Sequence, residues 1–186
     1  MKALPDVIDL NAEEEAKRLW QGARAAMEVA GEDLIALLQA VDLGCRTVEI
    51  LAAHRLHEVK DRFPATIGLL LETPVPEVNP ARDSLPGHTS LAFTEVLDLV
   101  SDEALACVAP GMHRGWEDRR FSCRRSRGTA RDALGLTLDA EARADLLTLA
   151  AYRNRLFRHP PPVRVVVGEI TGAFESLEAL VTGLLP

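Results

Sequence analysis

The sequence predicts an all-α protein, with an N-terminal helical hairpin or rod over residues 11–63 and a compact helical body over residues 64–186 that holds at most one short strand. Three observations predict this class. No proline occurs between Pro5 and Pro64, so almost the whole first third can be helical. Aromatic residues make up only 4% of a chain that is 47% hydrophobic, so the core is mainly Ala and Leu, which favour helices. At 186 residues, the chain is long enough to bury a core of its own.

A first helix is expected to begin after Asn11. Asn11 can cap this helix while Glu14 reaches back to it, which is the pattern of a capping box, and the acidic run 13–15 lies at the positive end of the helix dipole. Apolar residues then recur at steps of three and four and form one stripe: Ala12, Ala16, Leu19, Trp20, Ala23, Ala26, Met27 and Ala30. Gly31 ends or bends this helix.

A second, longer helix is expected from residue 33 to residue 63, because Pro64 stops it. Its apolar residues alternate in steps of four and three, which is the spacing of a coiled-coil seam: Leu34, Leu38, Val41, Cys45, Val48, Ala52, Leu56, Val59 and Phe63. Such a helix is about 46 Å long. A compact chain of this size is only about 40 Å across.

The length of this seam raises the question of what covers it. Either the other helices of the same chain cover it, or a second copy or a partner protein does, and we favour the second interpretation. Aromatic and arginine side chains dominate binding hot spots, so Trp116 joins the predicted interface. The other residues predicted to form it are Leu34, Leu38, Val41, Val48, Leu56 and Val59.

The second part of the chain alternates proline-rich breaks with short helices. Residues 72–89 hold four prolines and predict an extended loop that docks against its own body or a neighbouring subunit. The β-branched run 163–167 predicts the one short strand. Helices are expected over residues 90–100, 102–108, 119–135, 139–158 and 169–184. Ser101 is the expected N-cap of the helix over 102–108, and Asp139 that of the helix over 139–158.

Charge is distributed unevenly along the chain. The whole sequence carries a net charge of −7, yet residues 114–131 hold seven arginines and two acidic residues, a local net charge of +5. The guanidinium group forms bidentate hydrogen bonds with carboxylates and phosphates, so this segment predicts an anion-binding surface. Its candidate residues are Arg119, Arg120, Arg124, Arg125 and Arg127. Pairing with acidic side chains of the same chain or of a neighbour is the favoured interpretation, because a nucleic-acid site disagrees with the overall negative charge.

One cluster has the residue types of a metal site. His54, His57 and Glu58 lie at steps of three and one on the long helix, so they share a face with Asp61. Two histidines and a carboxylate can supply part of a zinc or iron site. This face points away from the apolar seam, so a solvated polar surface is the favoured interpretation, and we predict no cofactor.

The three cysteines argue against a disulfide framework. Cys45, Cys107 and Cys123 are odd in number and form no Cys-x-x-Cys pair. A packed, inert thiol is the favoured interpretation of each cysteine. The alternative applies to Cys123, which lies among arginines that would lower the pKa of an exposed thiol and make it reactive. No apolar run reaches the length of a bilayer span and no signal peptide opens the chain, so we expect a cytoplasmic protein.

These observations favour a non-catalytic scaffold, assembly or accessory subunit of a larger complex. In this hypothesis the chain self-associates through the 33–63 seam and docks partners through the proline-rich loop and the arginine-rich segment, whose natural partner is an acidic protein. One alternative is a metal-dependent enzyme that uses His54, His57 and Glu58. The other is a protein that binds an anionic ligand or nucleic acid through residues 114–131.

Overall fold

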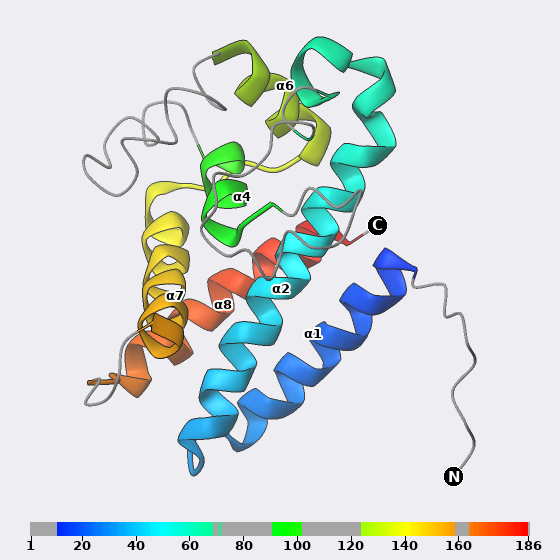
Figure 1. The fold of residues 1–186 in the computed structure, drawn as a ribbon. Coiled ribbons are helices and arrows are strands. Elements are labelled where there is room, and N and C mark those ends of the chain that lie inside the picture. The colour runs from blue at the N-terminus through cyan, green and yellow to red at the C-terminus, as the bar shows by residue number, and fades with distance from the viewer. Residues whose placement is uncertain (1–10, 69–70, 72–90, 102–123, 159–163, 186) are drawn as a thin grey trace, which may run out of the picture.

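The computed structural model describes residues 11–68, 71, 91–101, 124–158 and 164–185, and every structural statement below concerns these residues. They form an all-helical fold, which confirms the predicted class (Figure 1). The helices are α1 (Ala12–Val29), α2 (Leu34–Val59), α4 (Phe93–Val100), α6 (Arg124–Leu134), α7 (Ala140–Arg158) and α8 (Val167–Leu184). After α2 follow a 3₁₀ turn (Lys60–Arg62) and a π-helical turn (Pro64–Gly68).

The predicted N-terminal hairpin is present. Asn11 caps α1 as expected, since its side-chain oxygen accepts hydrogen bonds from the backbone N–H groups of Glu13 (2.9 Å) and Glu14 (3.3 Å). Asp33 caps α2 in the same way through the N–H of Ile35 (2.8 Å). The two helices pack side by side in opposite directions (Figure 1).

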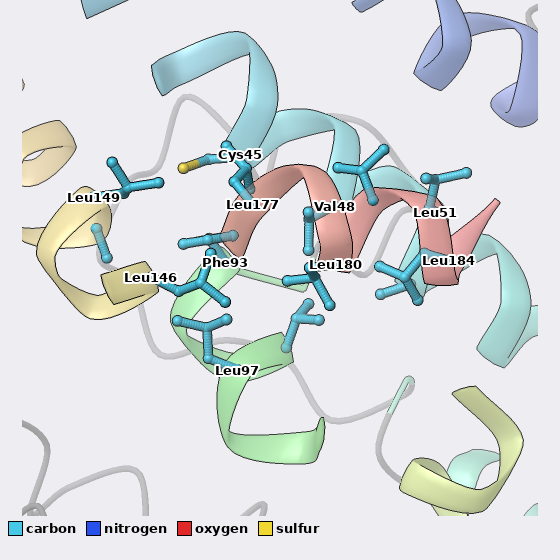
Figure 2. Packing of buried hydrophobic residues seen from close by; sticks show 14 of the residues in the cluster. Cys45, Val48, Leu51, Phe93, Leu97, Leu146, Leu149, Leu177, Leu180 and Leu184 are labelled. Carbon is cyan, nitrogen blue, oxygen red and sulfur yellow. The ribbon is translucent and has the colours of Figure 1, made fainter. Parts of the chain in front are cut away.

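Helix α2 lies at the centre of the molecule. It packs against α1, α4, α6, α7 and α8, and Figure 2 shows its side chains meeting those of α4, α7 and α8 in one apolar core. Gly44 allows α2 and α8 to approach closely, because a Cβ at this position would lie 2.5 Å from Cδ2 of Leu177. One continuous cluster of buried residues extends from Ala16 in α1 to Leu184 in α8, so the hairpin and the body share a core.

The apolar seam of α2 is covered mostly by the chain itself. Val41, Val48 and Leu56 are fully buried against the chain's own helices, whereas Leu38 and Val59 are half-buried and Leu34 is exposed. The observed helix has 26 residues and is therefore about 39 Å long, shorter than the sequence predicts. A single chain therefore covers the seam at Val41, Val48 and Leu56 without a partner.

The strand predicted over 163–167 is wrong. Residues 164–166 have no regular secondary structure, and Val167 is already the first residue of α8. A β-branched run needs a neighbouring strand to pair with, and the described part of the chain offers only an isolated bridge between Ser101 and Leu138. The N–H of Val166 instead donates to the hydroxyl of Tyr152 (3.1 Å).

Other predicted helices agree well with the structure. Asp139 caps α7 as expected, because its Oδ1 accepts the N–H of Ala142 (2.8 Å). The proline-rich loop 72–89 and the helix predicted over 102–108 lie outside the described residues. Among the helices that the structure describes, none combines the length and the apolarity needed to cross a bilayer.

Candidate functional site

The most distinctive surface of the described chain is the turn between α1 and α2, which we call the hairpin tip and define as residues 28–35. Three large apolar side chains project from it into solvent: Ile35 is 73% exposed, Val29 56% and Leu34 52%. Only six large apolar side chains are exposed among the described residues, and half of them lie in this short turn. Single exposed apolar residues are common, so the grouping of three within eight residues is what distinguishes this turn from the rest of the described surface.

The hairpin tip is also strongly acidic. Glu28, Glu32 and Asp33 are exposed around the three apolar side chains, and no lysine or arginine occurs from residue 25 to residue 45. None of the three carboxylates forms an ion pair with a described residue. Glu28 lies in the last turn of α1, which holds no basic residue, so its charge faces the negative end of the helix dipole. The tip therefore combines apolar surface with carboxylates that no described basic side chain pairs with, although Asp33 also caps α2.

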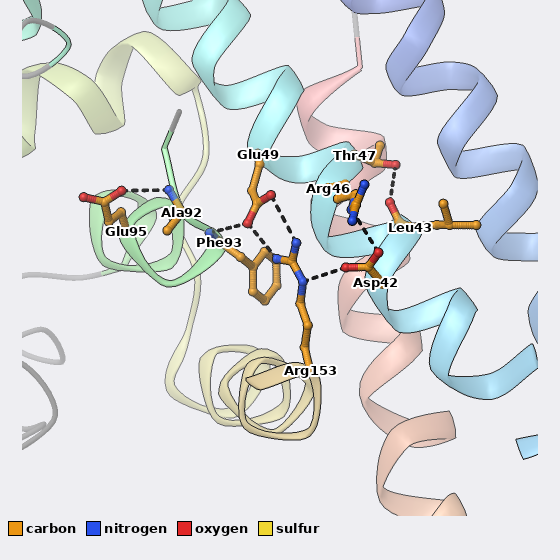
Figure 3. Close-up of polar contacts among 9 residues, drawn as sticks. All are labelled: Asp42, Leu43, Arg46, Thr47, Glu49, Ala92, Phe93, Glu95 and Arg153. Carbon is orange, nitrogen blue, oxygen red and sulfur yellow. Dashed lines mark hydrogen bonds and ion pairs between the residues drawn. The ribbon is translucent and has the colours of Figure 1, made fainter. Parts of the chain in front are cut away.

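A second group of polar residues lies inside the molecule and joins three helices (Figure 3). Arg153 on α7 donates from Nε to Oδ1 of Asp42 (2.9 Å) and from Nη1 to Oε1 of Glu49 (2.6 Å), both on α2. The same Glu49 oxygen accepts the backbone N–H of Phe93 at the start of α4 (2.9 Å). The side chains of Arg153 and Glu49 are each only 11% exposed. We call Asp42, Glu49 and Arg153 the charge clamp.

The charges of the charge clamp stabilise one another, as in an ion-pair network that holds helices together. Burial alone would lower the pKa of Arg153, but the hydrogen bond to Glu49 and the charges of Glu49 and Asp42 outweigh burial and raise this pKa. Arg153 therefore stays charged and fully engaged. Cys45 lies in the same region of α2, and burial raises the pKa of its thiol, which makes it a packing residue and a poor nucleophile.

Two further arginines also connect helices within the described part of the chain. Arg55 on α2 donates to the carbonyl oxygens of Leu134 (3.0 Å) and Leu185 (3.1 Å), which end α6 and α8. Arg143 on α7 pairs with Asp98 on α4 at 2.9 Å. Arginines in this protein thus serve to hold helices together, a role that depends on partners far away in sequence and that the sequence does not reveal.

The metal-site candidates come together only in part. His54 Nε2 and Glu58 Oε1 are 3.7 Å apart, and these side chains are 37% and 61% exposed. This is the contact expected of residues four apart on a solvated helix face. Among the described residues, which include His54, His57 and Glu58, no group of three or more His, Cys, Asp or Glu side chains is arranged to hold a metal ion.

The arginine-rich segment is described only at its end. Arg119, Arg120, Trp116 and Cys123 lie outside the described residues, so the anion site, the Trp116 interface and the reactive thiol stay predictions. Arg124, Arg125 and Arg127 occupy the first turn of α6, which holds no acidic residue, although their side chains are not described. Positive charge at the start of a helix opposes its dipole.

Comparisons with known proteins add no functional information. The chain matches no protein-family model, no curated protein and no solved structure. Of the two groups of residues described above, the charge clamp is internal and the hairpin tip faces solvent.

Proposed function

We propose that this protein is a non-catalytic scaffold or accessory subunit that associates with other protein surfaces, including its own copies, through the hairpin tip. The exposed cluster of Val29, Leu34 and Ile35 is the observation that supports this proposal. Val41, Val48 and Leu56 of the predicted seam are buried, so they are not part of the proposed contact. Leu34 belongs to the hairpin tip and Leu38 lies one turn beyond it, whereas the half-buried Val59 lies at the other end of α2.

The apolar cluster is large enough to contribute measurable affinity. Complete burial of a Val, Leu or Ile side chain contributes about 1.5–3 kcal/mol. The three tip side chains are roughly half to three-quarters exposed, so covering them contributes about 3 kcal/mol in total. This corresponds to a factor of about 100 in a dissociation constant.

Self-association of the purified chain tests the proposal without knowledge of other partners. The molar mass in solution is measured by light scattering over the micromolar range, for the wild type and for a Leu34→Gln/Ile35→Gln variant. The wild type is expected to show a mass that rises with concentration. The variant removes two of the three apolar side chains, or about 2 of the 3 kcal/mol, and is expected to associate about 30-fold more weakly. A wild type that stays monomeric at every concentration contradicts the proposal.

A matched control separates the tip from general surface hydrophobicity. Val167 is also exposed, at the first turn of α8, and lies outside the hairpin tip. A Val167→Gln variant is expected to associate like the wild type. Equal losses in Val167→Gln and in the tip variant would also contradict a specific role of the tip.

A further inference from the structure

We infer that the partner of the hairpin tip is a basic protein surface, on which lysine or arginine side chains border an apolar area. This inference rests on the proposed function and states the chemistry of the partner. It depends on residues 28–39, all of which the structure describes. Figure 1 shows this turn at one end of the helical fold, where a partner can approach it.

The apolar part of the tip lies on both sides of the turn. Val29 is the last residue of α1, and Leu34 and Ile35 are the first two residues of α2. Leu38 follows Leu34 by four residues, so the two share a face of α2, and Leu38 is only half-buried. Removing these side chains from water requires apolar groups on the partner. A basic surface without an apolar area therefore does not fit the tip.

Two carboxylates of the tip are available to a basic partner. Glu28 and Glu32 are exposed, and neither forms an ion pair with a described residue. Asp33 differs from them, because its carboxylate already accepts the N–H of Ile35 as the cap of α2. Glu28 lies in the last turn of α1, where negative charge opposes the helix dipole and no basic residue compensates. A lysine or arginine of the partner therefore stabilises both Glu28 and the end of α1.

The negative charge of the tip disfavours other classes of partner. Carboxylates repel nucleic acids and anionic lipid headgroups. Two tips repel each other for the same reason, since residues 25–45 contain no lysine or arginine, so copies of this chain are expected to join the tip to a different surface. Lysine and arginine suit the tip because their aliphatic stems cover apolar side chains while their charged ends reach the carboxylates.

The packing of the hairpin limits the spacing of the partner's groups. Helices that pack side by side, as α1 and α2 do, have axes about 8–10 Å apart. Glu28 and Leu34 belong to different helices of this pair. In a partner helix, residues seven positions apart lie about 10 Å apart along one face. A short amphipathic helix therefore presents basic and apolar groups at the spacing of the tip and is a suitable probe.

Binding of two designed peptides to the full chain tests this inference. The first peptide is a fluorescently labelled amphipathic helix of leucine and lysine, and the second has glutamate in place of every lysine. Fluorescence anisotropy in low salt measures both dissociation constants. The wild type is expected to bind the lysine peptide at least about tenfold more tightly than the glutamate peptide. Raising the salt concentration should reduce this difference.

Variants of the tip show whether the lysine peptide binds there. Glu28→Gln/Glu32→Gln is expected to bind this peptide about fivefold more weakly, because two exposed charge pairs are lost, and with a smaller dependence on salt. Leu34→Gln/Ile35→Gln is expected to bind it about 30-fold more weakly, because the apolar contact is lost. Unchanged helical circular dichroism shows that each variant is folded.

A matched control separates the tip from the overall negative charge of the chain. Glu175 and Glu178 are exposed on α8, so Glu175→Gln/Glu178→Gln removes as many carboxylates as the charge variant of the tip. This control is expected to bind the lysine peptide like the wild type. Equal losses in the control and in the charge variant of the tip overturn the inference.

The remaining outcomes distinguish the inference from the proposed function. A wild type that self-associates through the tip but does not bind the lysine peptide, or binds both peptides equally, overturns the inference and leaves the proposed function standing. A wild type that stays monomeric but binds the lysine peptide at the tip contradicts self-association and supports a basic partner.

Discussion

Arg153 on α7 donates a 2.6 Å hydrogen bond to Oε1 of Glu49 on α2, although 104 residues separate them in the sequence. The same Glu49 oxygen accepts the N–H of Phe93, the first residue of α4. One carboxylate thus fixes the relative positions of three helices. Because both charges are almost completely buried, each depends on the other for its stabilisation.

Removing one member of this pair is expected to destabilise the folded chain. In a Glu49→Gln variant, Arg153 stays buried without its principal charge partner, so the free energy of unfolding should fall by about 3–4 kcal/mol. Urea denaturation followed by circular dichroism measures this change.

An exposed ion pair provides the control for this variant. Arg24 Nε and Glu178 Oε1 are 3.8 Å apart, with side chains 62% and 50% exposed. Glu178→Gln is expected to change the free energy of unfolding by less than about 0.5 kcal/mol. Similar losses in Glu49→Gln and Glu178→Gln would contradict a special role for the charge clamp.

The sequence predicts those features of the fold that depend on residues close together in the chain. Asn11 and Asp139 cap helices because a cap depends on residues two or three positions away, and both appear in the structure as expected. The apolar stripe of α2 likewise follows from periodicity. Which surface covers that stripe depends on α4, α7 and α8, and periodicity alone does not indicate whether these helices belong to the same molecule.

The charge clamp shows what local reasoning misses. From the sequence, Arg153 is a basic residue near the C-terminal end of a helix, where the helix dipole favours it. In the structure it pairs instead with two carboxylates on α2, one of them 111 residues away. No spacing rule connects residues at such separations. Sequence patterns do not indicate the hairpin tip either. Ile35 lies off the seam positions, and its exposure depends on how α1 and α2 pack against each other.

Arg55 offers a second test of how arginines hold this fold together. Its two nitrogen atoms Nη1 and Nη2 each donate to a terminal carbonyl oxygen, of Leu134 and of Leu185. Arg55→Ala is expected to lower the free energy of unfolding by about 2 kcal/mol, because two carbonyl groups lose a charged donor. Arg55→Lys keeps the charge but cannot reach both carbonyls, so it should recover less than half of the loss. Complete recovery by lysine would show that charge alone matters.

Trp20 attaches α1 to the rest of the molecule. Its ring stacks on Phe174 of α8, with ring centroids 5.5 Å apart and an interplanar angle of 15°. Trp20→Ala is expected to cost about 3–5 kcal/mol and to make α1 the first segment cut in limited proteolysis. Trp20→Phe preserves an aromatic contact and should lose much less. Equal proteolysis of α1 in both variants would contradict this role of the stacked pair.

The buried thiol of Cys45 predicts how stability depends on pH. Burial raises the pKa of Cys45 in the folded chain above its ordinary value of 9.0, which the unfolded chain retains. Below pH 8 both states keep the proton, and this thiol has no effect on stability. Above pH 9 only the unfolded state loses the proton, so the free energy of unfolding should fall by about 1.4 kcal/mol per pH unit. Urea denaturation between pH 7 and pH 10.5 measures the slope.

A Cys45→Ala variant provides the control. It is less stable at pH 7 because it leaves a cavity, but its free energy of unfolding should fall less steeply with pH, by about 1.4 kcal/mol per pH unit, since the other titrating groups are unchanged. Parallel slopes in the two proteins would show that the thiol of Cys45 ionises in the folded state.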